Sequence, residues 1–482
     1  MESIQRPGGT CIILRDDVIL RDERHYLESG VSFCRDSRKG ETLYLSPSAF
    51  ELLIHLTSAS AVDDAWTHYT SRCSVNGEPA NREEFDDFVR GLLATGTLEA
   101  AGLGKRHTRP LSNLSLPVSG TAPIKPMTFP TRVSVELTRR CNMACLHCLR
   151  SSSPGLRRKE ELATWEILGL LHELDTNGVT SIALTGGETT LRPDIEAIIE
   201  HLRWLRTHVE FFTNGFRLRP ALIEKLAETQ RAKGQGFHVH LSLDGATPAT
   251  HDWLRARGSF ARATAATRAL CEAGVRVVVE TCLTPLNLDE LQDIVFLCRS
   301  SGAETVSIHP ISCTGRGGSG TLKLPMAEVY RAADEVARLR EEHRDGIDVR
   351  FDFRFTPSES DRHLDDFPLP QNTAPAGMFH MAIGADGQVY PCTESTGVPA
   401  LVMGDIRKET TAEIWRSPRW HLFRGGWTIG QLEGCRGCVF DGRCASQACR
   451  CYAAASQGDF FSPFPDCYLN SHSLWRESGG RT

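Results

Sequence analysis

Residues 133–148 read VSVELTRRCNMACLHC. The first six residues, Val133–Thr138, include three β-branched side chains and predict a buried strand. Cys141, Cys145 and Cys148 follow almost at once, in a CxxxCxxC spacing. Three thiolates at this spacing can bind three irons of a four-iron cluster and leave the fourth iron open to a substrate, whereas a cluster closed by four cysteines can only pass electrons. A strand that ends in such a loop therefore predicts a catalytic iron–sulfur site.

A structural zinc site is the alternative interpretation of these three cysteines. His147 stands between Cys145 and Cys148 and could supply a fourth ligand. Structural zinc sites normally use paired CxxC units, however, and the CxxxC spacing departs from that pattern. Iron is therefore the metal that the spacing favours.

The overall composition narrows the class of protein. The 482 residues carry a formal net charge of −6, which gives no reason to expect nucleic acid or a membrane surface as a partner. No apolar run approaches the roughly 20 residues that span a bilayer, and residues 1–11 lack the basic and apolar segments of a signal peptide. We therefore expect a cytoplasmic protein whose thiols stay reduced.

The 17 cysteines are unevenly distributed, and their grouping is informative in a reducing compartment. Clusters of cysteines with short spacing predict metal ligands there. Isolated cysteines are usually small buried apolar side chains instead. We expect that second role for seven scattered residues: Cys11, Cys34, Cys73, Cys271, Cys282, Cys298 and Cys313.

Length and local patterns divide the chain into five segments. Residues 1–105 are predicted to form a small α+β domain, and residues 106–128 a linker that contains Pro and Ser. Residues 129–330 form the predicted catalytic core, and residues 331–374 a bridging region. Residues 375–482 are rich in Cys and Gly, so this last domain is expected to need metal to hold it together.

The core segment alternates strands and helices, which is typical of parallel βαβ units. Six strands are expected, at Val133–Thr138, Ser181–Thr185, Val209–Thr213, Val239–Leu243, Val275–Leu283 and Thr305–His309. Amphipathic helices such as Trp165–Leu174 and Ile195–Leu205 separate them. The expected fold is therefore α/β, a partial (β/α)6 barrel of the TIM type, with functional residues at the carboxyl ends of the strands.

Further motifs follow the next three strands in order. They are Gly186-Gly187-Glu188, Thr213-Asn214-Gly215 and Ser242-Leu243-Asp244-Gly245, the last followed by His251-Asp252 and Arg255. Together with the three cysteines, they resemble the motifs of radical S-adenosylmethionine (radical SAM) enzymes over roughly residues 129–325. Two positions depart from that family, because His147 stands where an aromatic ring is more frequent and Thr189 where proline often follows the glutamate.

The resemblance implies a catalytic centre that cleaves S-adenosylmethionine reductively to a 5′-deoxyadenosyl radical. Its implied catalytic residues are the 4Fe-4S ligands Cys141, Cys145 and Cys148, together with Glu188, which would orient the methionine. Contacts with S-adenosylmethionine are implied at Gly186, Gly187, Glu188, Asn214, Ser242, Asp244 and Arg255.

A second group of cysteines lies near the end of the chain: Cys392, Cys435, Cys438, Cys444, Cys449, Cys451 and Cys467. Their order resembles the SPASM extension of peptide-modifying radical SAM enzymes, which holds two auxiliary clusters. The resemblance places one cluster on Cys435, Cys438, Cys444 and Cys467, and the other on Cys392 and Cys449. That family usually has a further cysteine before Gly387, which this chain lacks, so the second cluster is open at one iron, recruits Cys451 or is smaller. A zinc knuckle on Cys435, Cys438, Cys444 and Cys449 is the alternative.

The first segment resembles a peptide-recognition domain. Expected strands at Cys11–Leu14, Val31–Cys34 and Thr42–Leu45, with helices after Ser46, over Val62–Ser71 and after Asn81, predict a winged-helix plan. Such folds often bind DNA, but residues 1–105 hold 11 basic and 17 acidic residues and would repel phosphates. The stretch from Leu45 to Leu98 is similar to the PqqD-like domains of ribosomal-peptide maturases, which implies that a leader peptide binds here as an added strand.

Together these resemblances imply a peptide maturase. The radical would abstract a hydrogen atom from a ribosomally made precursor peptide, a thioether or carbon–carbon cross-link would form, and the auxiliary clusters would accept the remaining electron. A flavodoxin or ferredoxin would supply the reducing electron. Two alternatives stay open: a maturase of a folded enzyme, of the sulfatase or quinohaemoprotein type, and a zinc-stabilised peptide- or DNA-binding adaptor.

Overall fold

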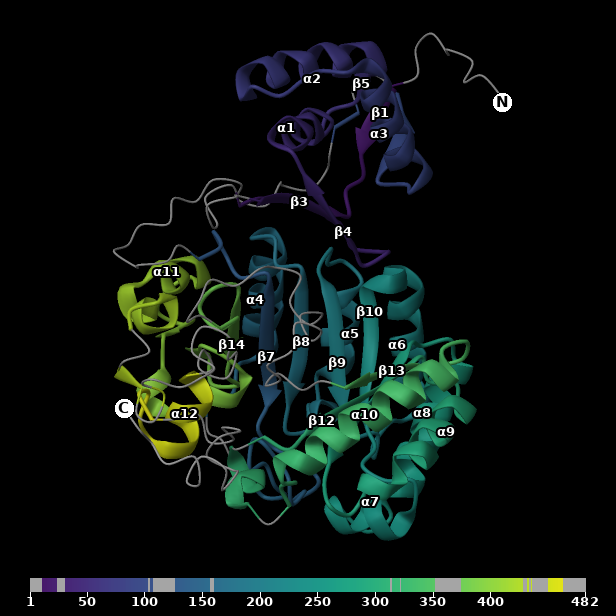
Figure 1. Ribbon diagram of the computed structural model, residues 1–482, viewed down its shortest axis with the longest axis vertical. Coiled ribbons are helices and arrows are strands. Elements are labelled where there is room, and N and C mark those ends of the chain that lie inside the picture. Colours follow the sequence, from purple (N-terminus) through teal and green to yellow (C-terminus); the bar gives the residue numbers. More distant parts are fainter. Residues whose placement is uncertain are drawn as a thin grey trace, which may run out of the picture.

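The computed structural model describes residues 11–23, 31–102, 105–106, 126–156, 160–312, 314–320, 322–351, 374–427, 431–432, 435 and 450–462. A small domain lies at one end of a much larger α/β body (Figure 1). Most of the predicted linker 106–128 and part of the bridging region 331–374 fall outside the described residues. The five-segment division stays a prediction, and helix α10 (Met326–His343) runs across its boundary at residue 330.

The small N-terminal domain combines two antiparallel sheets with helices α1 (Pro47–His55), α2 (Val62–Asn76) and α3 (Arg82–Ala94). One sheet holds β1 (Cys11–Leu14), β5 (Ser60–Ala61) and β6 (Leu98–Ala101), and the other holds β2 (Val18–Glu23), β3 (Val31–Asp36) and β4 (Glu41–Leu45). The three strands and three helices expected here are all present. Helices α1 and α3 have the expected caps, because the Ser46 side chain accepts from the Ala49 amide and the Asn81 side chain from the Glu83 amide.

Strand β2 gives no clear signal in the sequence, because charged residues interrupt its apolar pattern. Arg21 and Glu23 are nevertheless both buried, and they form an ion pair with each other. Arg21 donates to the carbonyl oxygens of Phe129 (2.6 Å) and Gly178 (2.9 Å), and Glu23 accepts from the Thr128 amide (2.7 Å). A buried ion pair needs such additional hydrogen bonds to offset the cost of removing two charges from water. Phe129 and Gly178 stand just before barrel strands, so this pair fastens the N-terminal domain to the amino end of the barrel.

Within the described residues, the large body is an open sheet of ten strands, in the order β13-β12-β11-β10-β9-β8-β7-β14-β15-β16. Neighbours from β13 to β14 are parallel. These parallel strands are β7 (Arg132–Thr138), β8 (Ser181–Gly186), β9 (His208–Thr213), β10 (Phe237–Ser242), β11 (Val277–Leu283), β12 (Thr305–Pro310), β13 (Asp348–Phe351) and β14 (His380–Ile383). The six expected strands are all present, which confirms the partial α/β barrel. Strand β13 has only four residues, two of them charged, and gives no sequence signal.

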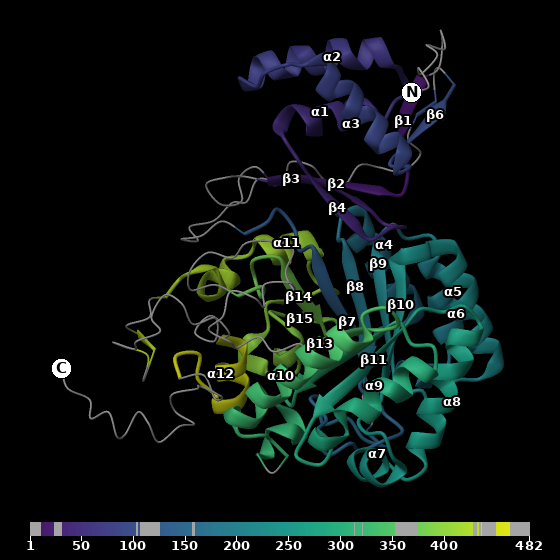
Figure 2. The same cartoon turned by 45° about the vertical axis from the view of Figure 1, so that its right-hand side comes forward.

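Helices connect the parallel strands and cover the outer face of the sheet (Figure 2). They are α4 (Thr164–Thr176), α5 (Ile195–Leu202), α6 (Pro220–Lys233), α7 (Pro248–Leu254), α8 (Ser259–Glu272), α9 (Leu291–Ser300) and α10. Because successive strand residues point to opposite faces, one face of each strand joins the apolar core and the other lines the barrel interior. In β9, Val209 and Phe211 are fully buried in that core, whereas Glu210 and Phe212 line an interior cavity.

The C-terminal part extends the sheet beyond β14. Strands β15 (Gln388–Tyr390) and β16 (Gly404–Asp405) add in antiparallel fashion, and α11 (Thr411–Arg416) and α12 (Arg450–Gln457) lie beside them (Figure 1). The turn between β14 and β15 uses Gly387 at a φ of 83°, a left-handed conformation that favours glycine. None of the helices in the described ranges is long and apolar enough to cross a bilayer.

Candidate active site

The CxxxCxxC loop lies at the carboxyl end of β7, away from the N-terminal domain. Cys141 and Cys145 are buried and Cys148 is half-buried, with Met143 and Phe216 packed against them. All three cysteines are free thiols. Burial raises the pKa of Cys141 to about 12, although the Met143 amide opposes this shift. Three thiols on one largely buried loop fit the irons of a 4Fe-4S cluster.

Arg316, which follows β12 in the chain, also holds this loop in place. No sequence motif predicts this contact. It lies in a short 3-10 helix, Gly315–Ser319. Its guanidinium donates to the carbonyl oxygens of Cys145 (2.8 Å) and Ser152 (2.7 Å), and its backbone amide donates to the Cys148 carbonyl (3.0 Å).

The backbone contact between Arg316 and Cys148 brings the two loops so close that Gly315 has no room for a side chain. A Cβ atom on Gly315 would lie 2.3 Å from the Cys148 carbonyl oxygen, and its φ of 63° also favours glycine. The cluster loop is therefore shaped by a segment about 170 residues further along the chain.

Gly186 and Gly187 support the same loop from the end of β8. The Gly187 amide donates to the Thr138 carbonyl (2.7 Å), and the Glu188 amide donates to the Arg140 carbonyl (2.9 Å). A Cβ on Gly186 would lie 2.2 Å from the Thr138 oxygen, and one on Gly187 would lie 2.2 Å from the Arg140 oxygen. The two glycines thus let the strand end and the cluster loop touch backbone to backbone.

Glu188 is buried and joins the ends of β8 and β9. One carboxylate oxygen accepts from the hydroxyls of Thr190 (2.6 Å) and Thr213 (2.7 Å), and the other accepts from the Asn214 amide (2.7 Å). The Asn214 side chain then donates to Asn142 Oδ1 (2.9 Å) inside the cluster loop. The structure therefore brings Glu188 and Asn214 together beside the cysteines, while their contact with methionine stays a prediction.

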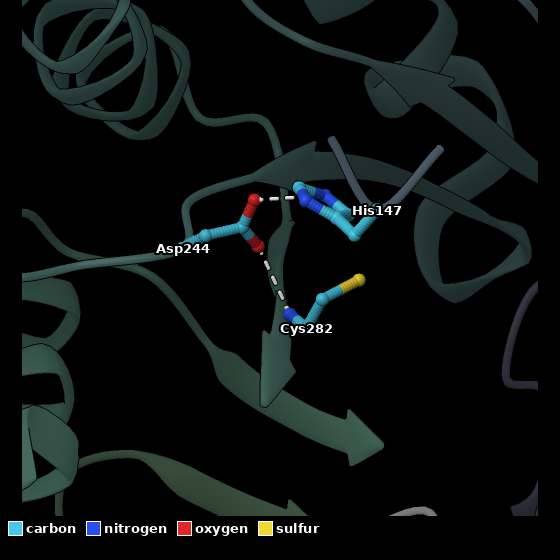
Figure 3. Close-up of side chains that lie close together, drawn as sticks. All are labelled: His147, Asp244 and Cys282. Atoms are coloured by element: carbon cyan, nitrogen blue, oxygen red, sulfur yellow. Dashed lines mark hydrogen bonds and ion pairs between the residues drawn. The ribbon is translucent and has the colours of Figure 1, made fainter. Parts of the chain in front are cut away.

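Asp244 is fully buried and connects three elements around the cluster loop (Figure 3). His147 Nε2 lies 3.1 Å from one carboxylate oxygen, which also pairs with the Arg255 guanidinium, and the Cys282 amide donates to the other oxygen (2.9 Å). Burial alone would raise the pKa of Asp244, but Arg255 and His147 hold it well below its usual range. Asp244 and Arg255, both expected near the cofactor, therefore form one ion-pair network with His147.

The structure also shows where Ser242 lies and whether His147 could belong to a metal site. Ser242 ends β10, is half-buried and lies opposite Glu280 of β11 in the sheet register. Ligand atoms of His147, Asp244 and Cys282 lie within 4.8 Å of one another, a spacing that a metal ion could use. The Arg255 cation already neutralises Asp244, however, so the geometry favours an ion-pair network over a metal site at His147.

Comparison with known proteins decides the family. Residues 135–298 match the radical SAM superfamily, and residues 375–439 match SPASM, an iron–sulfur cluster-binding domain. Mycofactocin maturase MftC from Mycobacterium tuberculosis (strain H37Rv) is 31% identical over 329 residues, which cover 64% of this chain and 78% of that relative. This chain belongs to the radical SAM superfamily. It is an enzyme whose cofactors are 4Fe-4S clusters and S-adenosylmethionine, as its motifs predict.

Other radical SAM proteins extend the comparison. PqqA peptide cyclase from Streptomyces rochei is 27% identical over 349 residues, which cover 71% of this chain and 90% of that relative. The crystal structure of Streptococcus suis SuiB bound to S-adenosylmethionine matches with a TM-score of 0.69 at 14% identity, and it covers 95% of this chain and 100% of SuiB. At that identity the likeness shows the fold alone, over almost the whole length of both chains.

The SPASM part of this radical SAM enzyme is described only in part. Cys392, Cys435 and Cys451 are buried, whereas Cys438, Cys444, Cys449 and Cys467 lie outside the described residues. Cys392 begins a short 3-10 helix, Thr393–Ser395, and α12, which carries Cys451, packs against that helix. This contact supports recruitment of Cys451 to the cluster at Cys392, and the full ligand sets stay predictions.

We predict that changing Cys141, Cys145 and Cys148 together to Ala abolishes reductive cleavage of S-adenosylmethionine, because the cluster loses its three protein ligands. Deoxyadenosine released by the anaerobically reconstituted protein with dithionite measures this cleavage. The scattered Cys73, buried in the N-terminal domain, provides the matched control, and Cys73→Ala should keep the activity. Deoxyadenosine formation by the triple variant would contradict the assignment.

We also predict that Gly187→Ala lowers the iron bound at the cluster loop, because the new Cβ would collide with the Arg140 carbonyl and displace the loop. Iron and sulfide analysis of the purified protein checks this expectation. Gly169→Ala in α4 is the control, because nothing lies within 4 Å of a Cβ there and alanine suits a helix interior. Equal iron content in the two variants would show that the loop does not depend on this close approach.

Proposed function

We propose that this radical SAM enzyme matures a ribosomally made precursor peptide by installing a thioether or carbon–carbon cross-link. The observation that carries the proposal is the small N-terminal domain beside the radical SAM barrel, in which one sheet edge has no further strand among the described residues. The names of its relatives agree with a peptide substrate: MftC is a maturase, PqqA peptide cyclase acts on a peptide, and SuiB was solved with its precursor peptide SuiA.

The open edge belongs to strand β4. Within the described residues, β4 pairs with β3 alone, whereas β2 at the other edge of the sheet is fastened to the barrel through Arg21. Leu43 and Tyr44 of β4 leave 40% and 48% of their surfaces exposed, which is unusual for large apolar side chains on a sheet edge. A leader peptide that adds as a strand here would gain backbone hydrogen bonds and apolar contacts together.

A cavity of about 1100 Å³ inside the barrel offers space for the core of the peptide. His147 and Leu149 of the cluster loop line one end, and Arg35 and Lys39 of the N-terminal domain line the other. The bound cluster and S-adenosylmethionine would supply a 5′-deoxyadenosyl radical that removes a hydrogen atom from the substrate. The protein's part is to aim that radical at one side chain held in the cavity and to keep water away from it.

The proposal includes the cofactor contacts that the motifs imply. Cys141, Cys145 and Cys148 would hold the cluster, and Glu188 and Asn214 would orient the methionine. Ser242, Asp244 and Arg255 would contact the remainder of S-adenosylmethionine. The C-terminal cysteines from Cys392 to Cys467 would hold auxiliary clusters, with Cys451 recruited to the cluster at Cys392. A small electron carrier such as a flavodoxin or ferredoxin would provide electrons, in the reducing cytoplasm that free thiols suit.

Co-expression with a short candidate precursor peptide encoded near the gene for this chain tests the proposal. We expect mass spectrometry of that peptide to show a loss of two hydrogens (about 2 Da) per cross-link, with fragment ions missing between the joined residues. The triple Cys→Ala variant is the control and should leave the peptide mass unchanged. An unmodified peptide beside active S-adenosylmethionine cleavage would overturn the proposal and favour a folded protein as the substrate.

The edge of β4 makes a separate prediction about binding. Replacing Leu43 and Tyr44 by Ser should weaken binding of the fluorescently labelled leader half of that peptide by about tenfold, because two apolar anchors are lost. Val75→Ser on α2 is the matched control, since Val75 is 67% exposed in the same domain but lies away from the edge. If both variants bind the labelled leader with equal affinity in anisotropy titrations, the leader binds elsewhere on the protein.

A further inference from the structure

Cys282, His309 and Glu280 form a continuous series of polar contacts on two adjacent strands of the barrel. Cys282 Sγ lies 3.3 Å from His309 Nε2, and His309 Nδ1 lies 3.4 Å from a Glu280 carboxylate oxygen. The second Glu280 oxygen lies 2.7 Å from His240 Nδ1. The sheet register sets this arrangement, because Cys282 of β11 lies directly opposite His309 of β12. A thiol, an imidazole and a carboxylate in this order form the usual arrangement of a nucleophile or acid, its base and an orienting group.

This series faces the cavity rather than the apolar core. Cys282, Glu280 and His309 all line the cavity, and each side chain is half-buried. Cys298, another cysteine outside the clusters, is by contrast fully buried in the core between apolar residues. Cys282 also stands at the carboxyl end of β11, beside His147 of the cluster loop. It therefore lies between the radical-forming centre and the space proposed for the substrate.

Charged groups from four neighbouring segments surround the Cys282 thiol. They are His309 of β12, His147 of the cluster loop, Asp244 after β10 and Arg255 after α7, with Glu280 two residues away on β11 itself. Burial would raise the pKa of Cys282 and Asp244 opposes its ionisation, but His309 and His147 together lower the pKa to about 6. At neutral pH the side chain is thus a thiolate held beside two histidine cations, and a thiolate can accept a proton.

We propose that Cys282 is a catalytic residue whose thiolate accepts the proton released when the cross-link forms, and that His309, which Glu280 positions, stabilises that thiolate. The proposal rests on the proposed peptide cross-linking. Joining a carbon to a second atom breaks one C–H bond and one S–H or C–H bond. The first hydrogen would leave as an atom to the deoxyadenosyl radical that the bound cofactors supply, and the second would leave as a proton to the Cys282 thiolate. An auxiliary iron–sulfur cluster held by the C-terminal cysteines would accept the remaining electron, since such a cluster is a one-electron acceptor.

Cys282→Ala and Cys282→Ser in the reconstituted holoenzyme test the proposal, with the candidate precursor peptide as substrate. We expect cross-linked peptide to fall by about 100-fold, the ordinary contribution of a general base, while deoxyadenosine formation changes less than about twofold. The ratio of deoxyadenosine to cross-linked peptide therefore rises. Cys271→Ala in α8 is the matched control and should keep the wild-type ratio, since Cys271 is half-buried but lies outside the cavity. An unchanged ratio in both Cys282 variants would overturn the proposal.

A second measurement does not depend on turnover. Iodoacetamide labelling of the wild-type holoenzyme, mapped by peptide mass spectrometry, should modify Cys282 with a midpoint near pH 6. Burial raises the pKa of Cys271 to about 11, so that thiol serves as the internal reference and reacts only in alkaline solution. His309→Gln should raise the Cys282 midpoint by more than about one pH unit, because the neighbouring cation is lost.

The product ratio and the labelling profile test the proposed function and the role of Cys282 separately. A wild-type enzyme that leaves the peptide unmodified contradicts the proposed function, and the labelling profile then still decides whether the thiol is activated by His309. A Cys282 midpoint near the ordinary thiol value of about 8.5, or one that His309→Gln does not move, would overturn the role of this series.

Discussion

The close approach between the cluster loop and the end of β8 is the constraint on which the active site depends. Thr138 and Arg140 accept hydrogen bonds from the backbone of Gly187 and Glu188, and side chains at positions 186 and 187 would occupy the space of those carbonyl oxygens. A loop fixed at this distance presents its three thiols at the carboxyl ends of the parallel strands. Glu188 extends the same support to β9 through the Asn214 amide.

The two ends of the barrel contact different parts of the protein, because all of its parallel strands run in the same direction. The amino ends hold the N-terminal domain through the buried pair of Arg21 and Glu23. The carboxyl ends hold the cluster loop, which Arg316 fastens from a distant segment. The cavity connects the two ends, because residues of the cluster loop and residues of the N-terminal domain both line it.

The polar interior of this barrel is costly unless its groups are paired, since buried charges need partners. Asp244 is paired with Arg255 and His147, and Glu280 with His240 and His309. Cys282 lies where these two networks meet, through its amide to Asp244 and its thiol to His309. The paired charges thus extend from the cluster loop into the cavity, and Cys282 connects the two networks.

The sequence by itself determined the elements whose signals are local. Strand β7 with its CxxxCxxC loop, the six core strands, the Ser46 and Asn81 helix caps and the glycine pair after β8 could all be predicted, because each depends on neighbouring residues. Strands β2 and β13 could not, because their charged residues interrupt the alternation that marks a strand.

Tertiary structure alone decided which distant residues meet. Sequence spacing treated Cys282 as one more buried apolar side chain, and it gave Arg316 and His309 no role at all. The parallel register places Cys282 opposite His309, and the chain's return after β12 brings Arg316 onto the cluster loop. Such contacts join segments far apart along the chain, so they depend on how strands align and loops fold back, which no local spacing records.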